Sequence, residues 1–176
     1  MVKEYRSIAR IQKTHGRNGE VVAVPTHGLP LLLQEGLEVA IVPPALRGSR
    51  YHVVQRATDG DAGQLVQFGG CHTLAGASEL VGKTVLARVS DLPADLVLHD
   101  ADALCGRIVR DKRLGVLGVI DGLMRGPAND VWIVSGAYGE VLVPVVDSMI
   151  RCVPTQGDIE VEIPRGLVPD DAKEES

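Results

Sequence analysis

IARIQKTHGRNGEVVAVP, residues 8–25, is the stretch that decides the fold. Apolar and polar residues alternate on both sides of a turn, residues 14–19, which holds two glycines and an asparagine. Alternation is typical of half-buried strands, and these turn residues accept the positive φ of a tight connection. The stretch therefore predicts the first hairpin of a β domain. Its tip carries cations, which are typical either of a nucleic-acid contact or of an ordinary solvated turn.

Short strand-like runs follow this hairpin at close intervals. They cover residues 37–42, 51–57, 64–68 and 84–89, and then 104–110, 115–123, 131–134, 140–144 and 159–163. The one convincing helix is predicted at residues 73–81, and residues 26–34 and 145–150 are predicted as an apolar loop and a short turn. Many short strands separated by turn signals indicate an all-β fold, with closed barrels or sandwiches rather than βαβ units.

A change of charge marks the boundary between two domains. Residues 1–90 hold ten Lys or Arg against seven Asp or Glu, whereas residues 91–176 hold eight against sixteen. The segment DLPAD at residues 91–95 interrupts the strand pattern at this point. We expect a first domain over residues 1–90, a linker over 91–98, a second domain over 99–168 and an acidic, disordered tail over 169–176.

Composition indicates a cytoplasmic protein. Aromatic residues are only 3% of the chain, so the cores must be mostly aliphatic, with Phe68 and Trp132 inside them. The three cysteines form no CxxC pair, which is typical of a reducing compartment. The N-terminus lacks a signal-peptide layout, and no run approaches the roughly 20 apolar residues of a membrane span. We expect no contact with a membrane.

The residues do not favour catalysis, a metal site or a cofactor. Cys71–His72 and the His99, Asp100, Asp102 cluster are isolated and lack metal-ligand spacing. Cys105 and Cys152 lie in apolar sequence, where a thiol is expected to behave as a small hydrophobic group. Gly16 and Gly19, like Gly115 and Gly118, do not have the spacing of a phosphate-binding loop. The loop over residues 126–130, with Asn129 and Asp130, is predicted as a turn or as a contact with a partner.

The best candidates for RNA binding are polar residues of two predicted loops. Contact with RNA phosphates and simple solvation are both consistent with these residues, and the sequence does not say whether the two loops share a face. The candidates are Lys13, His15, Arg17 and Asn18 in the first loop, and Arg47 and Arg50 in the second.

Taken together, six segments resemble the RimM family of ribosome maturation factors. They are IARIQKTHGRNGEV, GQLVQFGGCHTLAGASELVGKTVLARVSDLP, LCGRIVRD, GPANDVWIV, GEVLVPVVDSMIRCV and DIEVEIPRGL, which occur in the order of the family and span nearly the whole chain. The resemblance implies an N-terminal six-stranded barrel like those of translation factors, joined by a short linker to a C-terminal PRC-type barrel.

The resemblance also implies a non-catalytic function without cofactors. A family member binds the head of immature small ribosomal subunits and assists 16S rRNA folding and processing. The implied partners are the S nineteen ribosomal protein and the 16S rRNA precursor, and the protein is expected to be a monomer. The acidic second domain would then hold the cationic ribosomal protein, through His99, Asp100, Asp102, Asn129 and Asp130.

One departure from the family concerns an aromatic contact. The family often carries a Tyr-Tyr pair at the start of the second domain that is tied to ribosome association, whereas residues 95–106 here contain no tyrosine. The protein either uses other side chains or depends less on that surface. Two other functions stay open: a metal-dependent rRNA-processing enzyme using Asp91, Asp95, Asp100 and Asp102, and a PRC module docked to a membrane complex, for which no basic amphipathic helix is found.

Overall fold

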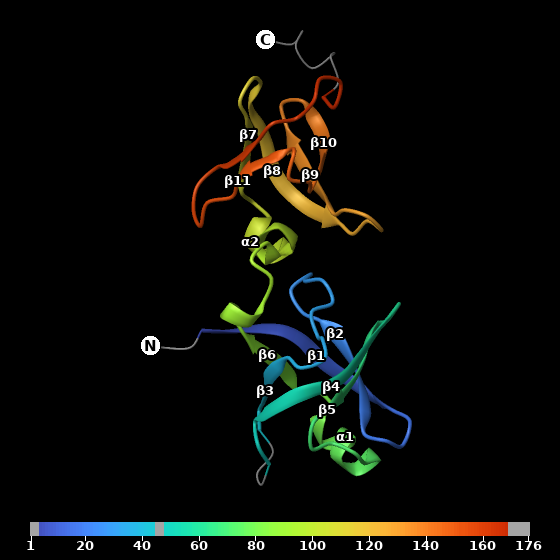
Figure 1. Cartoon of the computed structure of the whole chain (residues 1–176). Helices are drawn as coiled ribbons and strands as arrows, with labels where there is room; N and C mark the ends of the chain where they lie inside the picture. The colour runs from blue at the N-terminus through green and yellow to red at the C-terminus, as the bar shows by residue number, and fades with distance from the viewer. Residues whose placement is uncertain (1–3, 45–47, 169–176) are drawn as a thin grey trace. The chain divides into compact units, whose positions relative to one another are not determined.

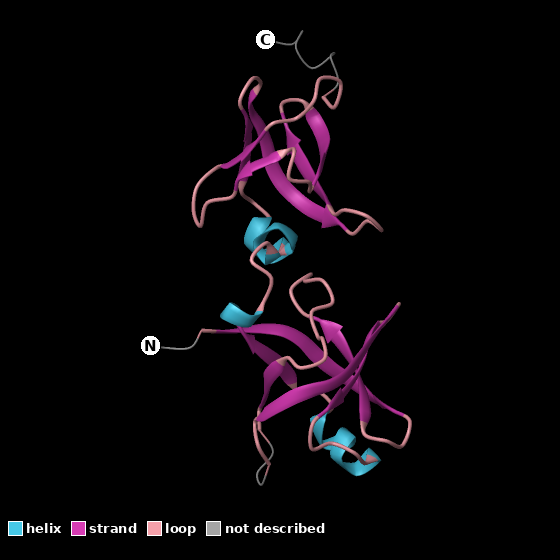
Figure 2. Ribbon diagram, viewed as in Figure 1, coloured by secondary structure: helices cyan, strands magenta, loops and turns pink. Residues whose placement is uncertain are grey.

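A computed structural model of the chain describes residues 4–44 and 48–168. It divides into two compact units between Ala94 and Asp95, and each is described by itself (Figures 1 and 2). The predicted tail, residues 169–176, and Arg47 lie outside the described residues.

The first unit is a closed six-stranded antiparallel barrel. Its elements are β1 (Tyr5–His15), β2 (Glu20–Pro25), β3 (Glu38–Val42), β4 (Tyr51–Gly60), β5 (Gly63–Phe68), α1 (Leu74–Leu80), β6 (Thr84–Arg88) and the 3-10 turn η1 (Val89–Asp91). The strands pair in the order β1-β2-β5-β4-β3-β6, and β6 pairs again with β1. Phe68 is fully buried, as predicted, among aliphatic side chains.

Two segments outside the strands, helix α1 and the loop over residues 26–34, complete the first unit. Thr73 caps α1 by accepting a hydrogen bond from the Gly76 N–H, 3.1 Å, and the helix buries Ala77 and Leu80. Residues 26–34 form a loop, and buried Gln64 fixes it by bonding to both the N–H and the C=O of Leu33, at 2.9 and 2.8 Å. A buried amide with both groups satisfied contributes stability instead of costing it.

The second unit is a six-stranded sheet around its own core. Its elements are η2 (Leu96–His99), α2 (Ala101–Leu104), β7 (Ile108–Asp111), β8 (Gly115–Met124), β9 (Val131–Gly136), β10 (Gly139–Pro144), β11 (Ile150–Cys152) and β12 (Ile159–Val161). The strand order is β10-β9-β8-β7-β12-β11, in which β12 and β7 are parallel. The core includes Trp132, again as predicted.

The sequence misassigned several short elements of this unit. The strand expected from Leu104 begins only at Ile108, because residues 101–104 form α2. Asp100 caps this helix by accepting a hydrogen bond from the Ala103 N–H, 3.3 Å. The short strand β11 and the 3-10 turn η2 were also missed. Elements of three or four residues are too short to display a hydrophobic period, so tertiary contacts determine them.

Candidate functional site

The tip of the β1–β2 hairpin exposes every candidate that the sequence placed there. Lys13, His15, Arg17 and Asn18 all face solvent. The turn itself is fixed at Gly19, where a Cβ would lie 2.3 Å from the Cys71 carbonyl oxygen. The Cys71 thiol donates to the Gly19 carbonyl, 3.5 Å, and the Gln67 amide donates to the Asn18 carbonyl, 2.9 Å. The tip is therefore held against the β5–α1 loop while its side chains are free to meet a partner.

The second candidate loop lies at the same end of the barrel. Arg50 is exposed directly before β4. The ring nitrogens of His52 lie 3.0 Å from the Ser49 carbonyl and 2.9 Å from the Gly69 carbonyl, so they join the β3–β4 loop to the β5–α1 loop. The β5–α1 loop also contacts Gly19, and α1 lies at this end (Figure 1). The fold thus brings the two candidate loops to one end, which the sequence left open.

None of the three cysteines, Cys71, Cys105 and Cys152, has the features of a nucleophile. Burial, with a smaller contribution from the Glu79 carboxylate, raises the pKa of the Cys71 thiol, which keeps it protonated. Cys105 and Cys152 are exposed, contrary to the expectation that they pack as small hydrophobic groups. Cys105 directly follows α2 where a strand was predicted, and Cys152 is the last residue of the short strand β11.

The second unit joins two of its five candidates in a charged cluster. His99 Nδ1 lies 2.6 Å from Asp130 Oδ2, and Arg125 forms an ion pair with the same carboxylate. Arg125 also donates to the His99 carbonyl, 2.7 Å, and Trp132 Nε1 donates to the Leu98 carbonyl, 3.0 Å. This cluster fixes η2 to the sheet. Sequence reasoning missed Arg125, because nothing in the sequence brings it to His99.

The other three candidates differ in exposure. Asp100 is buried at the start of α2, where its carboxylate serves as a cap, while Asp102 and Asn129 are exposed. Asp130 is buried as well. A direct contact with a partner is therefore open to Asp102, Asn129 and the partly exposed His99, whereas Asp100 and Asp130 shape the surface from beneath.

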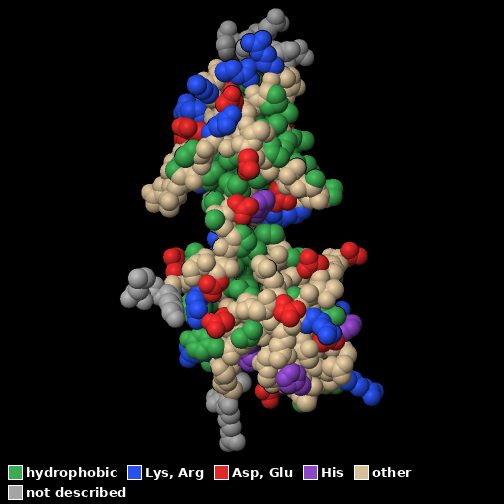
Figure 3. All heavy atoms as spheres, viewed as in Figure 1, with side chains coloured by type: hydrophobic (Ala, Val, Ile, Leu, Met, Phe, Trp, Pro, Cys, Tyr) green, Lys and Arg blue, Asp and Glu red, His purple; other side chains and the backbone are tan. Residues whose placement is uncertain are grey.

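The acidic character of the second half is not a simple property of its surface. Four of its sixteen acids belong to residues 169–176, and Asp100, Asp111 and Asp130 are buried. Figure 3 shows a group of Lys and Arg side chains on the visible face of this unit. Its charge is therefore distributed unevenly, and an overall net charge does not identify a binding face.

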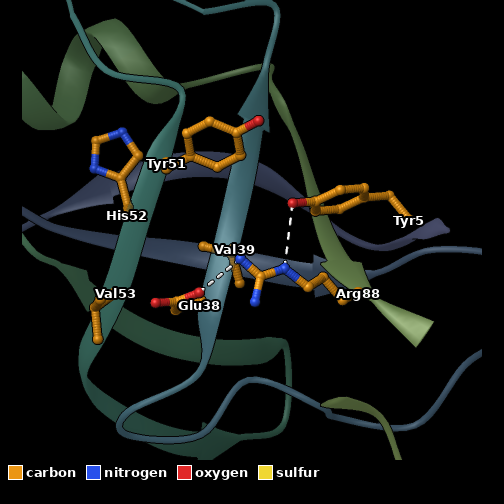
Figure 4. A pocket seen from close by; sticks show the side chains of 7 residues that line it. All are labelled: Tyr5, Glu38, Val39, Tyr51, His52, Val53 and Arg88. Carbon is orange, nitrogen blue, oxygen red and sulfur yellow. Dashed lines mark hydrogen bonds and ion pairs between the residues drawn. The ribbon is translucent and has the colours of Figure 1, made fainter. Parts of the chain in front are cut away.

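A hollow on the outer wall of the first unit was not anticipated from the sequence. It has a volume of about 570 Å³ (Figure 4) and is called the Tyr51 hollow here. It is lined by Tyr5, Glu38, Val39, Tyr51, His52, Val53 and Arg88. Arg88 donates to the Tyr5 hydroxyl, 3.4 Å, and forms an ion pair with Glu38, 2.9 Å. The Tyr5 contact, with smaller contributions from Glu38 and Asp91, raises the pKa of Arg88.

Two classes of site were also sought across the described residues. Residues 4–44 and 48–168 contain no group of three or more His, Cys, Asp or Glu side chains that could hold a metal ion. Within the same ranges, none of the helices is both long enough and apolar enough to span a membrane.

Comparison with known proteins relates the chain to one family. Residues 101–167 match the model of the RimM PRC barrel domain. Ribosome maturation factor RimM of Desulforamulus reducens is 24% identical, over 96% of this chain and 100% of its own. The Thermosipho melanesiensis protein of that name is 27% identical over 95% and 96%, and the Syntrophotalea carbinolica protein is 34% identical over 59% and 61%.

A solved structure is similar over the same length. The 16S ribosomal RNA processing protein RimM of Pseudomonas aeruginosa is 20% identical, with a TM-score of 0.42, over 92% of this chain and 98% of that one. The sequence relatives, which align from end to end, and the domain match agree on the assignment that the quoted segments suggested. The chain is thus similar over nearly its whole length to proteins named ribosome maturation factor RimM, and residues 101–167 match that family's PRC barrel domain.

Proposed function

We propose that the protein binds the head of immature small ribosomal subunits and assists 16S rRNA folding and processing by binding, without catalysis. Its partners in this proposal are the 16S rRNA precursor and the S nineteen ribosomal protein. It acts as a monomer in the cytoplasm. Similarity over nearly the whole chain to proteins named ribosome maturation factor RimM supports the general role.

One observation carries the RNA-binding part of the proposal. Two loops far apart in the sequence expose Lys13, His15, Arg17 and Arg50 at the same end of the barrel. The hairpin tip is anchored through its backbone at Gly19, and its cations remain exposed to solvent. Several cations from separate loops can neutralise successive phosphates of one RNA strand, which supplies affinity and orientation.

The second unit supplies the protein-binding part. Asp102 and Asn129 are exposed, and His99 is one-quarter exposed. Asp102 lies three residues after His99 in the sequence, and Asn129 directly precedes Asp130, the partner of His99. A carboxylate and an amide at such a surface accept hydrogen bonds from Lys and Arg of a basic ribosomal protein. Arg125 and Asp130 hold this surface in shape by fixing His99.

The test is binding to purified precursor subunits. The double variant Lys13→Glu and Arg17→Glu should weaken co-sedimentation with immature small subunits, and it should reduce the dependence of binding on salt by about two released counterions. The fold should be unaffected, because both side chains are exposed. Binding is measured over a salt series with the wild-type protein in parallel.

A matched control has the same change of charge in the other unit. Arg110→Glu with Arg151→Glu replaces two exposed arginines, which are paired with Asp158 and Glu162, and should leave the salt slope unchanged. Equal slopes for the wild-type protein and the hairpin variant would exclude the hairpin as the RNA contact. Absence of co-sedimentation for the wild-type protein would refute the proposed function.

A further inference from the structure

The Tyr51 hollow is built from one row of side chains that crosses four strands. Val53 on β4 pairs with Glu38 on β3, and Arg88 on β6 pairs with Tyr5 on β1. The ion pair between Glu38 and Arg88, 2.9 Å, joins the two halves of the row. All four side chains face away from the barrel core, and Tyr51 lies two residues from Val53 on the same face.

Aromatic rings are scarce in this chain, and two of them line this hollow. The sequence has five Phe, Trp and Tyr residues in all, and Phe68 and Trp132 are buried in the cores. Tyr51 is 58% exposed, and no described residue makes a hydrogen bond to its hydroxyl. In Figure 4 the hydroxyls of Tyr5 and Tyr51 point toward one another across the hollow. An aromatic face left in water is available for stacking.

The polar groups of the hollow place a hydrogen-bond acceptor beside a donor. The Glu38 side chain is 58% exposed and uses Oε2 for Arg88, so both of its oxygens keep lone pairs for a further partner. The Arg88 guanidinium is oriented by Tyr5 on one side and by Glu38 on the other. An aromatic ring, a carboxylate and a guanidinium therefore line the same hollow.

We propose that the Tyr51 hollow binds an unstacked guanine base of single-stranded RNA. Tyr51 stacks on the base, the Glu38 carboxylate accepts from the guanine N1–H and N2–H, and Arg88 donates to O6. Guanine alone among the four bases has two adjacent donors next to a carbonyl acceptor on one edge. Adenine and cytosine would present a ring-nitrogen lone pair to the carboxylate, and uracil would present a single N–H between two carbonyls.

The position of the hollow favours RNA over a protein partner. Tyr51 and His52 also line a second hollow, which the β3–β4 loop, with Arg50 at its end, shares with the β5–α1 loop and α1. Arg50, directly before Tyr51 in sequence, is an exposed cation. A strand whose base enters the hollow would therefore have its phosphates close to this cation. The choice of RNA as the partner rests on the proposed function, whereas the choice of guanine rests on the hollow itself.

The test uses fluorescein-labelled RNA pentamers and the full chain, with binding followed by fluorescence anisotropy. The wild-type protein should bind UUGUU about tenfold more tightly than UUAUU. Tyr51→Ala should weaken binding of UUGUU on the order of tenfold, while Tyr51→Phe keeps the ring and should bind like the wild type. Glu38→Gln should reduce the preference for guanine to about twofold or less.

Thr58→Ala is the control, because Thr58 is an exposed position of the same strand that does not line the hollow. Thermal unfolding verifies that each variant is folded. Equal binding of the two pentamers by the wild-type protein, or unchanged binding by Tyr51→Ala, would overturn the inference. So would a loss of subunit binding in Tyr51→Ala with unchanged pentamer binding, which would identify the hollow as a protein contact.

The two proposals fail in different experiments. Wild-type protein that co-sediments with precursor subunits but shows no preference for guanine refutes the hollow and leaves the function standing. Wild-type protein that prefers UUGUU but does not bind precursor subunits supports the hollow and refutes the proposed function.

Discussion

The two units close their small β cores by different means. The first closes through its backbone, since each of its six strands pairs with two neighbours. The second has β10 and β11 at the ends of its strand order and relies on side chains that reach across it. Charged residues therefore have different roles in the two units. In the first unit the cations of the candidate loops are available for binding, and in the second unit many charged side chains hold the fold together.

Asp111 illustrates the second arrangement best. It is 1% exposed at the end of β7, and its Oδ1 accepts from the N–H groups of Arg113 and Leu114, 2.8 and 3.0 Å. Its Oδ2 accepts from the Ile163 N–H, 2.9 Å, and so ties β7 to the segment after β12. Arg107 and Arg113 add bonds to the carbonyls of Pro154, Gly157 and Ile163.

The largest expected effect is therefore the loss of the Asp111 charge. Asp111→Asn keeps the oxygen for the turn but turns an amide N–H toward the Ile163 N–H, so we expect a loss of about 2 to 3 kcal/mol in the free energy of unfolding. Denaturant unfolding measures it. Asp121→Asn is the control because Asp121 is exposed on β8. A loss no larger than that of the control would mean that backbone pairing closes both units alike.

The same residue predicts a response to acid. Burial by itself would raise the pKa of Asp111, but the N–H donors of Ile163, Leu114 and Arg113 and the charge of Arg113 outweigh it and lower the pKa. A carboxyl with a lowered folded-state pKa contributes stability above its unfolded pKa of about 3.9, and this contribution is lost as the pH falls through the folded value. The wild-type protein should thus lose more stability below about pH 4 than Asp111→Asn loses.

In the first unit the corresponding weak point is a glycine and not a charge. Gly19→Ala combines a positive φ of 86° with a Cβ placed 2.3 Å from the Cys71 carbonyl oxygen. We expect a destabilisation of about 2 kcal/mol, since the chain must move as well as accept a left-handed conformation. Gly16→Ala is the matched control in the same turn, with a φ of 65° and no atom nearer than 3.9 Å. Equal losses for the two variants would show that the close approach to Cys71 costs nothing.

The smallest of these effects concerns the cluster around Asp130. Asp130→Asn removes the charge that both His99 and Arg125 contact, and we expect a loss of about 1 kcal/mol, because Arg125 keeps its bond to the His99 carbonyl and is itself exposed. Binding to precursor subunits should fall more than stability does, since η2 and His99 lose their fixed position. A variant that binds like the wild type would remove this cluster from the proposed protein contact.

The candidate sites show how far sequence reasoning extends. The hairpin cations could be found because they flank a turn whose two glycines are visible in the sequence, and Arg50 because it begins an evident strand. The Tyr51 hollow could not be found, because its row joins residues 5, 38, 53 and 88 through strand register. Asp100 follows His99 in the sequence, and Asp130 was predicted in the loop over residues 126–130. The burial of both residues depends on packing that no local pattern encodes.

The sequence by itself determined the all-β class and nearly every strand of the first unit, because alternation with a period of two and glycine-rich turns are local signals. The order of its segments also indicated the similarity to RimM proteins that the comparisons show. Only the tertiary structure decided which charged side chains form bonds within the fold and which face solvent. That division depends on strand register and on hydrogen bonds between residues dozens of positions apart, such as Asp111 and Ile163, and no local rule contains it.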